Sequence, residues 1–301
     1  MERWSVMALW TETWVKTALA NADSAAKSND ADGISRALRP LPIELYILLF
    51  FDPVMEEYPN LKRWLPALPP EDDQRAWAGN VGAFLMQQGA VFLDRLFDVH
   101  RRESGMESNA VTVLDYGCGW GRLIRLLYRY VSATQIYGLD PWPPSLERCQ
   151  RFGVHAQIAQ NDYLPNSLPF ETEFDIIFAY SVFTHISHRA QMAILEQWRK
   201  RIKPNGVIGV TIRQTNYWEK VEWPEEPLRN KLLAEHIESG FAFIRHSDDD
   251  TDRAKDYGDT SLSLAHIESH WKDWEIVDVD WRFVDEFQTY VFLKPDRLTC
   301  D

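Results

Sequence analysis

The chain has little of what stabilises small secreted proteins or anchors proteins in membranes. It holds only three cysteines, Cys118, Cys149 and Cys300, and these form neither a metal-binding spacing nor a disulfide framework. Its longest apolar run, Leu45 to Phe51, is far too short to span a bilayer. The first residues lack the basic and apolar regions of a signal peptide. We therefore expect a cytoplasmic protein with no membrane contact.

Basic residues are scarce relative to acidic ones. Lysine and arginine together number 32 against 45 aspartates and glutamates, which gives a net charge of −13. Because this surplus repels nucleic-acid backbones and anionic membrane surfaces, we expect a small-molecule partner and no nucleic acid. The 301 residues, 45% of them hydrophobic, can bury a substantial core as one large domain or as a domain with an extension. A homodimer is left open.

Residues 111–122, Val-Thr-Val-Leu-Asp-Tyr-Gly-Cys-Gly-Trp-Gly-Arg, combine a short apolar strand, a glycine-rich turn and the start of a helix. Gly117, Gly119 and Gly121 allow a sharp turn and the close approach of a ligand. The N–H groups at the start of the following helix would attract a polar ligand. The spacing departs from the dinucleotide fingerprint, because Arg122 stands where its third glycine belongs. The turn suits either a nucleotide-type site or simple strand–helix packing.

An acidic residue ends the next predicted strand, residues 136–140. Asp140 lies 25 residues after Asp115. This is near the sequence separation at which a carboxylate binds the two hydroxyl groups of a ribose. The alternative is an aspartate that begins a turn before Pro141. Together with the glycine-rich turn, Asp140 favours the ribose interpretation.

Strands and helices alternate along the following part of the chain. The pattern predicts strands over 154–159, 174–180 and 207–212. It also predicts helices over 144–152 and 189–202, the second capped by Ser187. A turn at 203–206 would end this second helix and lead into the strand 207–212. Two further strands, 274–284 and 287–293, are expected to pair through a tight turn at Asp285-Glu286. This alternation indicates an α/β fold with a doubly wound parallel sheet.

The N-terminal part reads as helical instead. We predict helices over 2–20 and 43–51, a linker over 21–33, and a long helix over 72–102 that breaks near Gly79 or Gly89. Residues 77–82 within it contain two glycines, so this stretch either passes close to a ligand or kinks the helix.

Residues 213–260 are expected to form an insertion with one helical piece over 228–239. The acidic run 248–252 inside it is either a solvated loop or a mobile lid.

Taken together, the motifs resemble those of the class I S-adenosylmethionine-dependent methyltransferases. Residues 113–122 are similar to motif I, Gly-Leu-Asp140 to the acidic motif II, Asn161-Asp162 to the third motif and residues 174–185 to the fourth. Residues 202–207, Ile-Lys-Pro-Asn-Gly-Val, are similar to the usual helix–turn–strand segment, with asparagine where glycine is common. The Ser-Val-Phe-Thr-His variant of the fourth motif is similar to a bacterial subgroup linked to small-molecule or sugar methylation.

The resemblance implies a Rossmann-like seven-stranded methyltransferase sheet over residues 106–301, with the insertion 213–260, preceded by a helical N-terminal extension over residues 1–105. It also implies S-adenosyl-L-methionine as the cofactor. The implied cofactor-binding residues are Asp115, Gly117, Cys118, Gly119, Asp140, Pro141, Asn161, Asp162, Tyr163, Ala179 and Tyr180. Among them, the glycines would hold the methionine part of the cofactor. Asp115 would orient the glycine-rich loop or the amino group of the cofactor. Asp140 would bind the ribose, Asp162 and Tyr163 the adenine, and Ala179 and Tyr180 would lie beside the transferred methyl group.

Methyl transfer to an oxygen also requires a base that removes the proton of the acceptor. His185, just after the fourth predicted strand, is the candidate base, and packing or capping of a helix is its alternative role. Arg213 and Tyr217, just past the fifth strand, are candidates for clamping the acceptor. Further candidates are His246, Tyr257 and His266. Because no histidines and carboxylates show a metal-binding spacing, we expect no metal ion.

Three functions follow from these observations. The first is methyl transfer to a hydroxyl or an amine of a small molecule or sugar. The second is another transfer on the same cofactor fold, such as aminopropyl transfer. The third is a non-catalytic protein that keeps the cofactor pocket.

Overall fold

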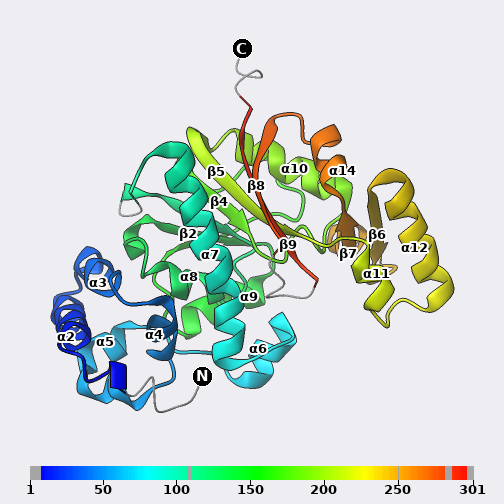
Figure 1. Cartoon of the computed structure of the whole chain (residues 1–301). Coiled ribbons are helices and arrows are strands. Elements are labelled where there is room, and N and C mark those ends of the chain that lie inside the picture. The colour runs from blue at the N-terminus through cyan, green and yellow to red at the C-terminus, as the bar shows by residue number, and fades with distance from the viewer. Residues whose placement is uncertain (1–7, 108–109, 250, 282–286, 297–301) are drawn as a thin grey trace. The chain divides into compact units, whose positions relative to one another are not determined.

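The computed structural model describes residues 8–107, 110–249, 251–281 and 287–296 (Figure 1). The chain divides into two compact units. The first unit comprises Met1–Asp94 and Met106–Ala159, and the second comprises Arg95–Gly105 and Gln160–Asp301. None of the described helices has the length and hydropathy that crossing a bilayer requires.

The N-terminal part is helical, as predicted, but the helices are placed differently. They are α2 (Thr13–Lys27), α3 (Ala31–Leu38), α4 (Ile43–Leu48), η1 (Pro53–Glu57), α5 (Pro59–Trp64), α6 (Glu71–Ala78) and α7 (Gly82–Ser104). The predicted linker over 21–33 is wrong. Helix α2 continues to Lys27 because Ala22 extends the buried face begun by Val15 and Leu19. Helix α3 then begins at Ala31 and is capped by Asp30, whose carboxylate accepts the Gly33 N–H at 2.9 Å.

The long helix predicted over 72–102 does break at Gly79. This residue has a φ of 67°, a left-handed conformation that ends α6. Gly89, the other suspected break, lies inside the continuous helix α7. A Cβ atom there would be 3.3 Å from the side chains of Leu123 and Leu126, so glycine lets α7 pack tightly.

Seven strands form one sheet in the order β3-β2-β1-β4-β5-β9-β8. The strands are β1 (Val113–Tyr116), β2 (Ile136–Asp140), β3 (Gln157–Gln160), β4 (Phe174–Ala179), β5 (Ile202–Ile212), β8 (Trp274–Asp280) and β9 (Thr289–Pro295). In the first unit β1 and β2 are parallel, and in the second unit β4 and β5 are parallel. Strand β9 is antiparallel to both β5 and β8. The predicted Rossmann-like seven-stranded sheet is therefore confirmed, and the turn predicted at Asp285-Glu286 lies outside the described residues.

Three short helices accompany this sheet. They are α8 (Arg122–Leu127), α9 (Pro143–Arg151) and α10 (His188–Arg199), with a further 3-10 turn, η3, at Ala133–Gln135. Ser187 caps α10, as predicted, because its hydroxyl accepts the Ala190 N–H at 3.2 Å.

The turn predicted over 203–206 is wrong, because β5 already begins at Ile202. Its register on β4 shifts between Phe174 and Ile176, where an irregularity takes up the additional residues. Gly206 is needed inside this strand, since a Cβ atom would be 3.0 Å from the Asp175 carbonyl oxygen.

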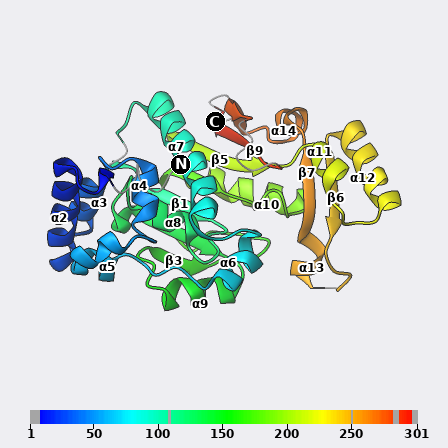
Figure 2. The same ribbon diagram turned by 60° about the horizontal axis from the view of Figure 1, so that its bottom comes forward.

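The insertion holds more structure than the sequence predicts. It contains α11 (Asn216–Lys220), α12 (Glu226–Ser239), β6 (Phe241–Arg245), α13 (Asp252–Asp256) and β7 (Gly258–Leu262), and α14 (Leu264–His270) follows it. Strands β6 and β7 form a separate antiparallel ribbon. Figure 2 shows this ribbon with α12 beside it. No strand is predicted in this region, because β6 is only five residues long and β7 mixes polar with apolar residues.

The buried guanidinium of Arg125 holds together segments of the first unit that are far apart in sequence. Its Nη1 donates to the carbonyl oxygens of Trp120 at 2.7 Å and Gly121 at 2.8 Å, and its Nη2 donates to that of Ala67 at 2.6 Å. Burial lowers the pKa of Arg125 to about 10, so it stays charged at neutral pH. One side chain thus fixes both the end of the glycine-rich turn and the segment before α6.

We predict that Arg125→Met destabilises the protein by about 3 kcal/mol, because it leaves buried carbonyl oxygens without donors. Chemical denaturation followed by circular dichroism measures the change. Arg101→Met, which removes an exposed arginine paired with Asp98 on α7, is the control and should stay within about 0.5 kcal/mol of the original protein. Equal stability of the two variants would contradict the role given to Arg125.

Candidate functional site

The glycine-rich turn after β1 is fixed onto the end of β2. All three glycines have positive φ, 78° at Gly117, 55° at Gly119 and 77° at Gly121. The N–H groups of Gly117 and Cys118 both donate to the Leu139 carbonyl oxygen, at 2.7 and 2.9 Å. The N–H of Gly121 donates to Cys118 within the turn. The N–H groups of these three residues are therefore used to shape the turn, and ligand binding by the N–H groups at the start of α8 stays a prediction.

Asp140 lies under this turn with both carboxylate oxygens engaged by the backbone. Oδ2 accepts the Gly119 N–H and Oδ1 accepts the Trp142 N–H, each at 2.9 Å. Burial raises the pKa of Asp140, and these two bonds together with one from the Ser145 hydroxyl oppose that effect. Each carboxylate oxygen has two lone pairs, so acceptor capacity remains for the hydroxyl groups of a ribose.

Asp115, at the carboxyl end of β1, has an unsatisfied oxygen. Its Oδ2 is buried and has no hydrogen-bond partner among the residues that the structure describes. Burial raises the pKa of this carboxyl group to about 8, although the Arg122 charge opposes the shift. An ammonium group would satisfy such an oxygen. S-adenosyl-L-methionine carries an ammonium group and a ribose, so Asp115 and Asp140 both fit it.

Trp77, near the end of α6, is a neighbour of the turn that sequence reasoning missed. Its ring lies 3.5 Å from the point where a Cβ atom on Gly119 would be. Its Nε1 donates to the Ser145 hydroxyl at 3.3 Å, and its ring stacks on Trp142 with centroids 4.8 Å apart. The guanidinium of Arg148 covers the ring at 4.0 Å. The only signal in the sequence was the unusual stretch 77–82.

Two other predicted cofactor residues in the first unit have different exposures. The side chain of Cys118 is buried, so only its backbone can border the turn. Pro141, directly after β2, is partly exposed.

The remaining predicted cofactor residues belong to the second unit. Asn161 is buried and its Nδ2 donates to the Asp162 carbonyl oxygen at 2.9 Å, whereas the Asp162 side chain is exposed. Tyr163 is partly buried. Ala179 ends β4, and it and Tyr180 are buried.

Ser181, the next residue after Tyr180, was missed by the sequence analysis. It has a φ of 58°, which is uncommon outside glycine, and its N–H donates to the Thr211 hydroxyl at 2.8 Å. Strained residues of this kind gather at functional sites, and this one follows the carboxyl end of a parallel strand.

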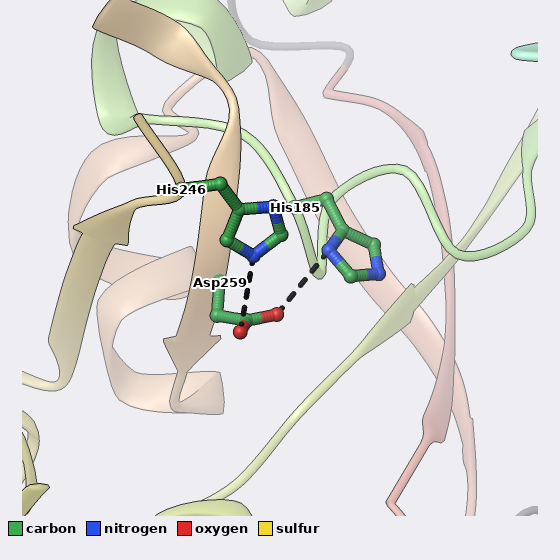
Figure 3. Close-up of side chains that lie close together, drawn as sticks. All are labelled: His185, His246 and Asp259. Carbon is green, nitrogen blue, oxygen red and sulfur yellow. Dashed lines mark ion pairs between the residues drawn. The ribbon is translucent and has the colours of Figure 1, made fainter. Parts of the chain in front are cut away.

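A second constellation lies around Asp259 in β7 (Figure 3). Arg213 Nη1 is 2.6 Å from Oδ1, His185 Nδ1 is 3.3 Å from Oδ1, and His246 Nε2 is 3.2 Å from Oδ2. Burial opposes ionisation of Asp259, but the bonds from both histidines and the Arg213 charge outweigh it and lower its pKa far below the usual value. Asp259 is therefore an ionised, buried acceptor. The sequence analysis missed it because it belongs to the ribbon that was not predicted.

His185 has both ring nitrogens occupied. Arg213 Nη2 lies 3.0 Å from Nε2, and a guanidinium can only donate, so Nε2 must accept. The proton of the neutral ring then sits on Nδ1, which faces the Gly258 carbonyl oxygen at 2.9 Å. Burial and the Arg213 charge lower the pKa of His185. In this arrangement His185 offers no lone pair to an acceptor proton.

The same hydrogen bonds bear on metal binding. His185, His246 and Asp259 lie close enough for their ligand atoms to surround one ion. Because Arg213 fixes the proton of His185 on Nδ1, however, that nitrogen has no lone pair for a metal ion. The trio is therefore better described as a hydrogen-bond network around a carboxylate.

The three predicted catalytic residues do come together. Besides His185 and Asp259, Arg213 Nη1 reaches the Thr184 carbonyl oxygen at 2.9 Å. Its guanidinium lies 4.1 Å above the ring of Tyr217, whose pKa is raised by burial. Arg213 is thus a centre that holds its neighbours in place.

His266, another candidate, belongs to a different group of residues. Its Nε2 lies 3.3 Å from His188 Nδ1, and its ring stacks on His270 with centroids 4.0 Å apart.

Comparisons with known proteins agree with the motif order. Residues 113–206 match the family described as methyltransferase domain. No curated protein matches the chain.

Several solved structures are similar to this chain at low identity. A S-adenosylmethionine-dependent methyltransferase from Clostridium acetobutylicum ATCC 824 is 14% identical, with 74% of this chain and 95% of that chain covered and a TM-score of 0.47. The CcbJ methyltransferase from Streptomyces caelestis is 16% identical, with 75% and 90% covered and a TM-score of 0.46. DesVI from Streptomyces venezuelae is 13% identical, with 75% and 97% covered and a TM-score of 0.49.

The family match spans the glycine-rich turn, the acidic end of β2 and strands β3 and β4. Residues 113–206 are therefore similar to a methyltransferase domain. Asp115 and Asp140 lie within this segment, and their geometry fits S-adenosyl-L-methionine as the cofactor.

The raised pKa of Asp115 predicts a stability change with pH. The folded protein holds this proton more tightly than the unfolded chain, so its contribution is complete below about pH 4 and is lost as the pH rises toward 8. Asp115→Asn imitates the protonated acid, and without cofactor we expect it to be more stable than the original protein at pH 8 by about 1–3 kcal/mol, with a smaller difference at pH 5.

Calorimetric melting of both proteins between pH 5 and 8 measures this difference. Asp98→Asn, which changes an exposed residue of α7, is the control and should leave the curve unchanged. Parallel melting curves for Asp115→Asn and the original protein would show that Asp115 carries no buried charge.

Proposed function

We propose that the protein transfers the methyl group of S-adenosyl-L-methionine to a hydroxyl group or an amine of a small molecule or sugar. The observation that carries this proposal is the constellation around Asp259, where an ionised carboxylate, two imidazoles and a guanidinium gather beside aromatic rings. A few convergent polar groups among aromatic faces are typical of small-molecule sites. The net charge of −13 argues against a nucleic-acid acceptor. The cytoplasmic location, the lack of a membrane partner and a homodimer stay predictions.

For the cofactor we keep the roles that the motifs imply. Asp140 binds the ribose, Gly117 and Gly119 border the methionine part, and Asp115 meets its ammonium group. The bonds that fix Asp140 under the turn and the unsatisfied oxygen of Asp115 support these assignments. The other residues of the proposed cofactor set are Cys118, Pro141, Asn161, Asp162, Tyr163, Ala179 and Tyr180.

We propose that His185, Arg213 and Tyr217 belong to the acceptor site. Their roles follow from the contacts that each residue makes. The bound cofactor supplies an electrophilic methyl group on a sulfonium, so the protein has to align the acceptor and provide for its proton. Arg213 is a positioning residue, because its Nη1 and Nη2 groups are bonded to Thr184, His185 and Asp259. The ring of Tyr217 lies under its guanidinium and supports that orientation.

The test is a transfer assay with cofactor labelled in its methyl group and a panel of glycosides, phenols and amino sugars. We expect the label on one class of small acceptor, together with S-adenosylhomocysteine. Arg213→Met should lower the rate by about 10²-fold through misplacement of its partners, with cofactor affinity kept.

Two outcomes would contradict this function. Label found only in added RNA or protein would overturn the acceptor class. A protein that binds the cofactor but labels no acceptor would favour the non-catalytic alternative, and aminopropyl transfer from the decarboxylated cofactor would favour the other transferase.

A further inference from the structure

His246 differs from His185 in having one ring nitrogen free. Its Nε2 is 3.2 Å from Asp259 Oδ2, and because that carboxylate is ionised and can only accept, Nε2 carries the proton. The lone pair of the neutral ring is then on Nδ1. Within the described part of the chain, no group is hydrogen-bonded to this nitrogen. The side chain is 38% exposed, so Nδ1 is open to a ligand.

The β6–β7 ribbon fixes this pair of residues. His246 directly follows β6 and Asp259 lies in β7, where the register pairs Arg245 with Gly258 and Ile244 with Asp259. The backbone N–H of His246 continues the pairing by donating to the Tyr257 carbonyl oxygen at 3.3 Å. The imidazole and the carboxylate that orients it are therefore held by backbone hydrogen bonds on neighbouring strands.

Aromatic rings enclose the imidazole of His246. Tyr257 meets it edge to face with centroids 5.4 Å apart, and Trp223 does so at 5.4 Å from another direction. The ring of His185 lies 6.1 Å away. Trp223 is 47% exposed, which is unusual for so large an apolar side chain and leaves part of the ring open to an acceptor.

We propose that His246, oriented by Asp259, is the general base of the transfer and that the acceptor group is a hydroxyl. This inference rests on the proposed function and names the substrate class within it. An amine with a free lone pair attacks without prior loss of a proton, whereas a hydroxyl gains from a base in the transition state. A carboxylate behind the imidazole stabilises the imidazolium that forms, as in other oriented histidine bases.

The methyl transfer forms one bond and breaks one bond. The acceptor oxygen forms a bond to the methyl carbon while the carbon–sulfur bond breaks, and that electron pair remains on sulfur. The hydroxyl proton passes to Nδ1 of His246 and later leaves to water. The charged and titratable groups that face the imidazole and the Asp259 carboxylate are His185, Arg213, Tyr217 and Tyr257. Arg213 balances the charge of Asp259 before the proton arrives.

His246→Gln is the informative variant, because its amide can still donate to Asp259 but offers no basic nitrogen. With the hydroxyl acceptor found in the transfer assay, we expect kcat to fall by about 10²–10⁴-fold while cofactor affinity stays unchanged. The acidic limb of the pH–rate profile should also disappear. His270→Gln, an exposed histidine on α14 outside this constellation, is the matched control and should keep full activity.

A second measurement needs no acceptor. Diethyl pyrocarbonate modifies accessible, unprotonated imidazole nitrogens, so peptide mapping at pH 7 should find His246 modified well before His185.

The outcomes separate the two proposals. Activity of His246→Gln within about threefold of the original protein, a change in KM alone, or slow modification of His246 would overturn the base assignment while the methyltransferase function stands. A protein that methylates only amines would overturn the hydroxyl assignment. A protein that methylates nothing would contradict the proposed function itself.

Discussion

The carboxylate of Asp140 is the constraint on which the cofactor half of the structure depends. It binds the N–H of Gly119 in the turn after β1 and that of Trp142 at the start of α9, so one side chain joins the two segments that define the turn. The N–H groups of Gly117, Cys118 and Gly121 are bonded to backbone carbonyl oxygens, so Asp140 is the fixed polar group that we expect to meet a ribose. Burial raises its pKa, and these backbone bonds act in the opposite direction.

A second buried carboxylate, Asp259, organises the proposed acceptor half in an analogous way. It is bonded by two imidazoles and a guanidinium, and the proton positions follow from two rules, that arginine can only donate and that an ionised carboxylate can only accept. Arg213 therefore donates to Nε2 of His185, and His246 is the histidine that keeps a free ring nitrogen. The residue nearest the family motif is thus not the one best prepared to accept a proton, and in our proposal the insertion contributes chemistry as well as structure.

Local sequence patterns predicted the part of the fold in which local and long-range preferences agree. The turn after β1, the acidic end of β2 and the Ser187 cap of α10 follow from side chains and spacing alone. The prediction of a linker over 21–33 is wrong because the small polar residues there give no sign that helix α2 continues and buries Ala22. Asp259 could not be predicted, because Arg213 and His185 are 46 and 74 residues away along the chain and only backbone bonds from β7 to these residues bring them together.

The measurement that tests the central claim most directly is calorimetric titration with S-adenosyl-L-methionine and, separately, S-adenosylhomocysteine. The account predicts binding of both ligands at one site, and loss of both in Asp140→Ala with the fold retained by circular dichroism. Binding of neither ligand by the folded protein, or unchanged affinity in the variant, would contradict it.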